Sequence, residues 1–146
     1  MKTVWDAGVR NELLERFARL QHNQRPKWGK MNAGQMVAHC TGPMRSAMGE
    51  MEVTEKWTPM RFRLLRYLVI YVLPWPKGAP TAPEFIHQGP EDLDRNRKAL
   101  AAALERFAAH RGKPFRDHAA FGRLSEKDWG CLMWRHLDHH LTQFGV

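Results

Sequence analysis

The last thirteen residues, "WRHLDHHLTQFGV", place three histidines among tryptophan, leucine and phenylalanine. On an α-helix, at roughly 100° per residue, His136 and His140 lie only about 40° apart. Their face also carries Trp129, Leu132, Met133 and Gln143. Because two imidazoles one turn apart can ligate a single metal ion, this spacing indicates part of a metal site facing the protein interior. Such pairs also occur in helices that bind no metal, so a third ligand is required.

His39, in the segment "MNAGQMVAHC", is the best third ligand, because its helical face also carries Asn32, Gln35 and Met36. His139 lies nearer the edge of the apolar face, about 60° from His136. We therefore predict a position beside the site for His139. Three neutral imidazoles suit zinc, nickel, copper or ferrous iron, and an open fourth coordination position is typical of catalytic sites.

The other polar residues receive lesser roles. We predict that Gln143, Asn32 and Gln35 orient water or substrate, and no residue stands out as a general base. Cys40 diverges from His39 by about 100° and is predicted to be a small buried hydrophobic residue. A solvated or capping role is predicted for His22, His87, His110 and His118. A dinuclear centre needs inward-facing carboxylates, which we do not expect from Glu105, Glu126 or Asp138.

The elements that must position these residues are predicted to be helices. Helices are expected over 6–21, 32–49, 58–73, from about 91 to 111, and over 125–145. Asn32 with Gln35 and Ser125 with Asp128 match the capping box. Pro43 cannot donate to the carbonyl of His39, which predicts a kink or break there. The resulting fold class is all-α: a four-helix bundle with an accessory helix and an extended, proline-rich crossover loop over 74–85, in one domain covering 1–146.

Composition limits the possible partners. The chain has 146 residues, 43% of them hydrophobic and 26% charged, which is typical of soluble globular proteins. The net charge of +8 comes from scattered residues without a nucleic-acid-binding motif, so we predict no nucleic acid and a surface that favours anionic small molecules. Absence of a secretory signal and of a cysteine framework favours the cytoplasm.

Two apolar surfaces raise the question of membranes and of a second subunit. The apolar run 64–73 is too short to span a bilayer, which needs about 20 residues. Because Arg61 and Arg63 precede the run, it could lie on a membrane surface. Packing of the run on the body of the protein or on a second subunit is preferred, so no membrane partner is predicted. Trp134 and Leu141 fall opposite the histidine face, and we predict that they form the surface of a homodimer.

The segments "MNAGQMVAHC" and "HLDHHLTQF", with "TAPEF" and "FGRLSEKDW" between them, resemble the DinB/YfiT-like metalloprotein superfamily over essentially the whole chain. The resemblance is closest to small bacterial members without an assigned reaction. It implies a four-helix bundle, often dimeric, that holds a divalent metal, commonly zinc or nickel, through His39, His136 and His140. Family members often continue His-Arg-Gly-Gln after the last ligand. Here Leu141 replaces the arginine, so no substrate role is carried over for that position, whereas Gln143 keeps its place.

The resemblance further implies a metal-dependent enzyme acting on a small molecule, either a transferase or isomerase that uses a low-molecular-weight thiol, or a hydrolase. The alternative is a non-catalytic bundle whose metal is structural. An open fourth coordination position would favour the enzyme, and a closed one the structural role. A basic nucleic-acid-binding or membrane-surface protein is a third possibility, which rests on charge and on residues 61–73 alone.

Overall fold

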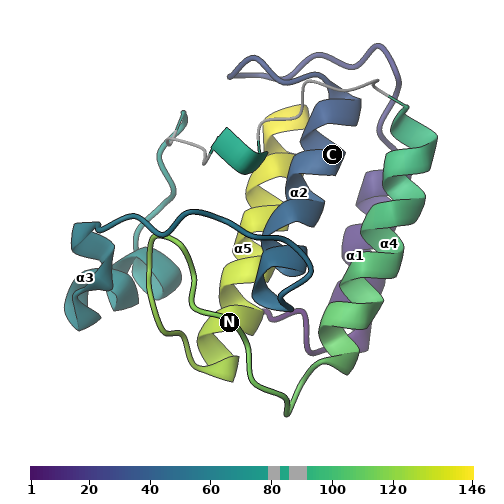
Figure 1. Cartoon of the computed structure of the whole chain (residues 1–146). Helices are drawn as coiled ribbons and strands as arrows, with labels where there is room; N and C mark the ends of the chain where they lie inside the picture. Colours follow the sequence, from purple (N-terminus) through teal and green to yellow (C-terminus); the bar gives the residue numbers. More distant parts are fainter. Residues whose placement is uncertain (79–82, 86–91) are drawn as a thin grey trace.

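The protein is an all-α bundle, as predicted. The structure is a computed structural model that describes residues 1–78, 83–85 and 92–146. Its helices are α1 (Ala7–Ala18), α2 (Ala33–Ala47), α3 (Arg63–Tyr67), α4 (Leu93–Ala109) and α5 (Glu126–Phe144), and the described residues form no β-strand. In Figure 1 the four long helices form the bundle, and the short α3 lies to one side. Helix α2 contacts both α4 and α5, and α1 contacts the same two helices.

Local capping fixes where the two histidine-bearing helices begin. Asn32 Oδ1 accepts from the backbone N–H of Gln35, whose Oε1 accepts from the N–H of Asn32. Ser125 and Asp128 form the same reciprocal pair at the start of α5. Both capping boxes confirm the sequence prediction. Because each box sets the first turn, it also sets the face on which every later side chain of that helix lies.

The four long helices agree with prediction except at two points. Helix α1 ends at Ala18, before the predicted Gln21. Helix α2 runs without interruption through Pro43, so the predicted break does not occur. Proline removes only one helical hydrogen bond, and packing of α2 against α4 and α5 holds the turns on either side. Gly49 and Gly145, where the predicted helices end, follow the ends of α2 and α5 and have positive φ, the backbone conformation that commonly terminates a helix.

The core is built from apolar residues that recur at three- and four-residue spacing along the helices. Its buried members include Leu13 and Phe17 of α1, Leu100, Leu104 and Phe107 of α4, and Trp129 and Leu132 of α5. The prediction for Leu141 is wrong: this side chain is fully buried, and Trp134 is partly buried against the core. Helix α5 is contacted by α1, α2 and the segment 68–72, so it is covered on more than one side. Leu141 therefore cannot contribute to a dimer surface.

Residues 58–73 form three short helical pieces rather than one helix. A 3-10 turn, η1 (Pro59–Arg61), leads into α3, and a π-helical turn, η2 (Leu68–Val72), follows. Ile70 is buried and Val69 and Tyr71 pack partly against the core, as predicted for packing on the body of the protein, whereas Phe62, Leu64 and Tyr67 are exposed. The alternative of packing on a second subunit stays a prediction. No helix among the described residues is both long enough and apolar enough to cross a bilayer.

The proline-rich segment is only partly described. Pro83–Phe85 forms a 3-10 turn, η3, where an extended chain was predicted, and residues 74–76 have no regular structure. The predictions for residues 79–82 and for His87 lie outside the described residues.

Candidate metal centre

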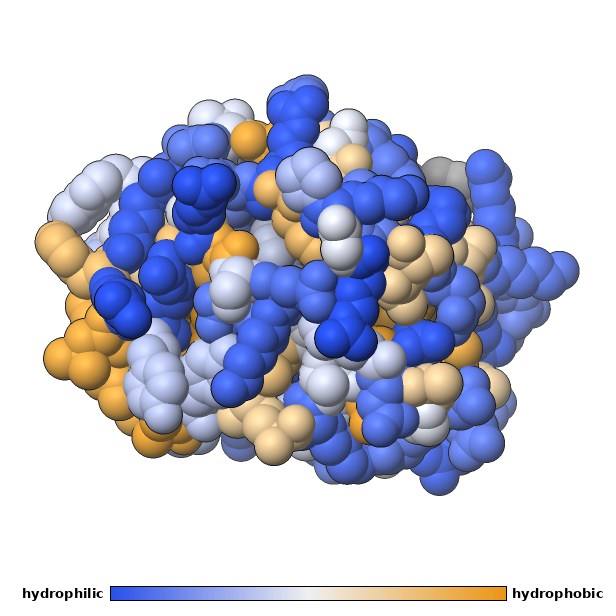
Figure 2. Space-filling view, turned by 90° about the horizontal axis from the view of Figure 1, so that it is seen from below, coloured by the Kyte–Doolittle hydropathy of each residue, from blue (hydrophilic) through white to orange (hydrophobic). Residues whose placement is uncertain are grey.

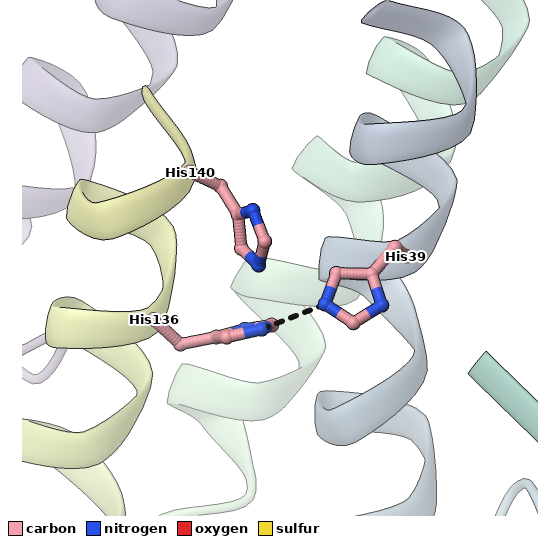
Figure 3. Close-up of side chains that lie close together, drawn as sticks. All are labelled: His39, His136 and His140. Atoms are coloured by element: carbon pink, nitrogen blue, oxygen red, sulfur yellow. Dashed lines mark hydrogen bonds between the residues drawn. The ribbon is translucent and has the colours of Figure 1, made fainter. Parts of the chain in front are cut away.

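Three imidazoles from two helices converge between α2 and α5 (Figure 3). His39 comes from α2, and His136 and His140 come from successive turns of α5. One ring nitrogen from each lies within 4.8 Å of those from the other two. The Nε2 atoms of His39 and His136 are 3.0 Å apart. The sequence prediction that these three side chains lie together is therefore met.

The ring of His140 is held by a hydrogen-bonded chain to the loop before α2. The side-chain Nε2 of Gln143 donates to the carbonyl oxygen of Trp28 at 2.7 Å. This contact turns Oε1 of Gln143 toward Nδ1 of His140, 2.8 Å away. Because an amide oxygen can only accept, Nδ1 of His140 carries the proton, and its Nε2 presents a lone pair.

The ring of His39, like that of His140, turns its Nδ1 toward an oxygen that accepts a hydrogen bond. Its Nδ1 lies 3.3 Å from the carbonyl oxygen of Phe85, which can only accept, so Nδ1 is the donor. The ring of Phe85 also packs edge-on against His39, with 6.2 Å between the ring centroids. His39 therefore presents Nε2 to the cluster, as His140 does.

The ring of His136 completes the cluster and is the least satisfied by the protein. Its buried Nδ1 has no hydrogen-bond partner among the described residues. Its Nε2 faces the Nε2 of His39 at 3.0 Å, a separation that requires a proton or a cation between two such nitrogens. Ligands of a tetrahedral zinc, each about 2.0–2.1 Å from the ion, stand about 3.3 Å apart. The three nitrogen donors thus lie close enough together to hold one metal ion.

Burial keeps the two imidazoles of α5 neutral. Desolvation lowers the pKa of His136 well below its usual value, and the neighbouring His140 and His39 lower it further. Burial also lowers the pKa of His140 to about 3, although the bond to Gln143 opposes the change. Neutral imidazole is the form that binds metals, so at pH 7 both rings of α5 are in the binding state.

His139 lies beside the cluster rather than in it. Its ring contacts those of Trp28, Trp75 and His140. It also lines a cavity of about 320 Å³, whose other walls come from Met1, Tyr71, Trp75, Trp134, Arg135, Asp138 and Thr142. Burial lowers the pKa of His139, partly offset by Asp138. This placement agrees with the predicted position beside the site.

The remaining candidates are engaged elsewhere. Asn32 and Gln35 use their side-chain oxygens in the capping box, and their predicted role toward substrate remains a prediction. Cys40 is fully buried, as predicted, and burial raises the pKa of its thiol. Each of the three carboxylates considered above forms an ion pair with an arginine: Glu105 with Arg10, Asp138 with Arg16, and Glu126 with Arg111.

The other described histidines have local roles. Nδ1 of His118 accepts from the backbone N–H groups of Ala120 and Phe121 within a turn, not at a helix end. His22 pairs with Asp94 at the exposed surface, and His110 bonds to the carbonyl of Pro114.

Sequence analysis missed the residues that hold the histidines from outside their own helices. Trp28 and Phe85 act through their backbone carbonyls, a role open to any residue type. Gly29 has φ +83°, and a Cβ at this position would lie 2.6 Å from Nε2 of Gln143. Among these residues, only the residue type of Gly29 points in the sequence to such a close approach.

Comparison with known proteins places the chain in one family without adding a function. Residues 8–145 match the model of a family described as a protein of unknown function (DUF1569). This family lies within the DinB/YfiT-like superfamily. No curated protein and no solved structure matches the chain.

Proposed function

The chain belongs to the DUF1569 family, and we propose that it binds one divalent metal ion through His39, His136 and His140. The observation that carries this proposal is the convergence of three imidazole nitrogens within 4.8 Å of one another. Two of the rings have the tautomer that a ligand through Nε2 needs, fixed by Gln143 and by the carbonyl of Phe85. Three imidazoles suit zinc, nickel, copper or ferrous iron, and the resemblance to the DinB/YfiT-like superfamily favours zinc or nickel.

We further propose that the protein is a metal-dependent enzyme acting on a small molecule. A divalent metal held by three histidines supplies Lewis acidity, which activates a water or a thiol for attack on an electrophile. The reaction is therefore a thiol-dependent transfer or isomerisation, or a hydrolysis. Trp75 is in ring contact with both His136 and His139, so an aromatic wall lies beside the cluster. The net charge of +8 favours an anionic substrate.

Elemental analysis of protein prepared without an affinity tag tests metal binding. The wild type, loaded with zinc and freed of excess, should retain about one equivalent, as a mononuclear three-histidine site holds. The variant His136→Ala should retain far less. His110→Ala is the matched control, because His110 is a histidine that lies outside the cluster and bonds to Pro114. Equal retention by the wild type and His136→Ala would refute the site.

A second experiment separates an enzyme from a protein whose metal is structural. The zinc- and nickel-loaded proteins are assayed with a panel of physiological thiols and electrophilic acceptors, and with simple esters and amides. Turnover should appear with the loaded wild type and be lost in both His39→Ala and His136→Ala. Absence of turnover across the panel, together with loss of helical circular dichroism when the metal is removed, would assign the metal a structural role.

A further inference from the structure

An apolar patch covers residues 57–73, which include η1, α3 and η2. Among the described residues, the large hydrophobic side chains that are exposed lie almost entirely in this segment: Trp57, Phe62, Leu64, Leu65, Tyr67, Val72 and Leu73, with Met1 as the exception. Trp57 is 75% exposed and Leu64 is 69% exposed. Figure 2 shows hydrophobic atoms gathered on the side of the molecule where Figure 1 places α3, with hydrophilic residues beside them. A contiguous exposed patch of this kind typically marks an interaction surface.

Polar contacts on the opposite side attach this segment firmly to the protein. The guanidinium of Arg66 donates to the carbonyls of Phe121 and Arg123. The guanidinium of Arg135 in α5 donates to the carbonyls of Val69, Ile70 and Leu73. Arginines thus help to hold the segment to the protein, with Ile70 buried beneath it, while the apolar side chains of α3 face outward.

The charges around the apolar patch are mainly positive. Arg63 is exposed within it, and three further exposed cations lie beside it: Lys56, Arg123 and Lys127. Lys127 places its Nζ 5.8 Å from the ring centroid of Tyr71. The nearby acids are already engaged, since Glu55 pairs with Arg61, and Asp128 accepts from the hydroxyl of Tyr71.

From this combination we propose that the apolar patch docks on the surface of a lipid bilayer with anionic headgroups. Trp57 and Tyr67 have the amphipathic rings that favour the boundary between water and acyl chains, and Phe62 beside them is apolar. Arginine and lysine beside them attract anionic headgroups. The contact lies at the surface of the bilayer, because no described helix can cross one. A second copy of the chain fits less well, since pairing this face with itself would bring two positive patches together.

Co-sedimentation with large unilamellar vesicles tests the proposal on the full chain. Vesicles of phosphatidylcholine are compared with vesicles in which a third of the lipid is phosphatidylglycerol. The wild type should bind the anionic vesicles and lose binding as salt is raised. The double variant Leu64→Gln, Leu65→Gln should bind at least about tenfold more weakly. Arg63→Gln should weaken binding about fivefold.

The matched control is Arg25→Gln, which removes the same charge from an exposed position in the loop between α1 and α2. Its binding should equal that of the wild type. Equal losses for Arg25→Gln and Arg63→Gln would overturn the proposal, because they would show general charge attraction.

Failure of the wild type to bind anionic vesicles would also overturn the proposal. If, in that case, light scattering shows a dimer that Leu64→Gln, Leu65→Gln dissociates, the patch serves a second copy instead. Circular dichroism of each variant checks that it is folded.

Discussion

Nδ1 of His140 and Oε1 of Gln143 lie 2.8 Å apart, and this contact determines which nitrogen of His140 faces the other two histidines. The two residues are one turn apart on α5, so the helix itself brings them together. The direction of the bond is set from a distant part of the chain, because the carbonyl of Trp28 occupies the amide nitrogen of Gln143. Outer hydrogen bonds of this kind orient metal-binding histidines and raise their basicity.

Replacing Gln143 with alanine should weaken metal binding while leaving all three histidines in place. Loss of such an outer partner typically costs about 10–100-fold in metal affinity, because the ring loses its fixed tautomer and orientation. Competition of the protein with a chromogenic zinc chelator measures the affinity. Gln21→Ala, at an exposed position outside the site, is the matched control and should bind zinc as the wild type does. Unchanged affinity in Gln143→Ala would show that Gln143 does not position His140.

Gly29 gives a sharper test of the same chain of contacts. Gly29 and Gly112 have nearly the same backbone, with φ +83° and +82°, but a Cβ on Gly29 would meet Gln143, whereas one on Gly112 meets nothing within 4 Å. Both Gly→Ala variants should lose about 1–2 kcal/mol of unfolding free energy from the left-handed backbone. Only Gly29→Ala should also lose zinc affinity, by about tenfold, because Gln143 must move. Matching zinc affinities in the two variants would contradict this.

Local rules explain what could be predicted from the sequence. The capping boxes at Asn32 and Ser125 depend on residues three apart, and they fixed the starts of the two helices that carry the histidines. With the helix starts known, the angular spacing of 100° per residue placed His136 and His140 on one face. The agreement for His39 also needed α2 to pack next to α5, which the resemblance to a known bundle implied.

The failures come from contacts between segments distant in the sequence. The helical-wheel prediction for Leu141 assumed one buried face, but α5 is contacted by two helices and by η2. The role of Trp28 depends on a bond that spans 115 residues and uses a backbone atom. The outward orientation of α3 results from Arg66 and Arg135, whose bonds to distant carbonyls leave no periodic pattern in the sequence.

Adding zinc to the metal-free protein should raise its melting temperature. A ligand at one hundred times its dissociation constant stabilises the folded state by about 2.7 kcal/mol if the unfolded chain does not bind it. For a chain of this size, that corresponds to roughly 5–10 °C. Thermal unfolding followed by circular dichroism measures the shift, and excess chelator should reverse it. His136→Ala should show little shift, and a full shift in this variant would place the stabilising ion elsewhere.

The stability of the metal-free protein should fall as the pH is lowered from about 6.5 to 4, and His118 should account for part of the fall. Burial, with a smaller contribution from Arg61, lowers the pKa of His118 to about 4. The unfolded chain takes up this proton near pH 6.5, so between the two values protonation favours unfolding. The contribution is at most about 3 kcal/mol.

His118→Asn keeps an acceptor for the N–H groups of Ala120 and Phe121 but cannot titrate, so its unfolding free energy should depend less on pH. Urea unfolding at several pH values, with chelator present, measures this dependence. His136 and His140 titrate in both proteins, and only the small effect of His118 on His136 differs between them. Parallel pH profiles for the two proteins would show that His118 is not held neutral by the fold.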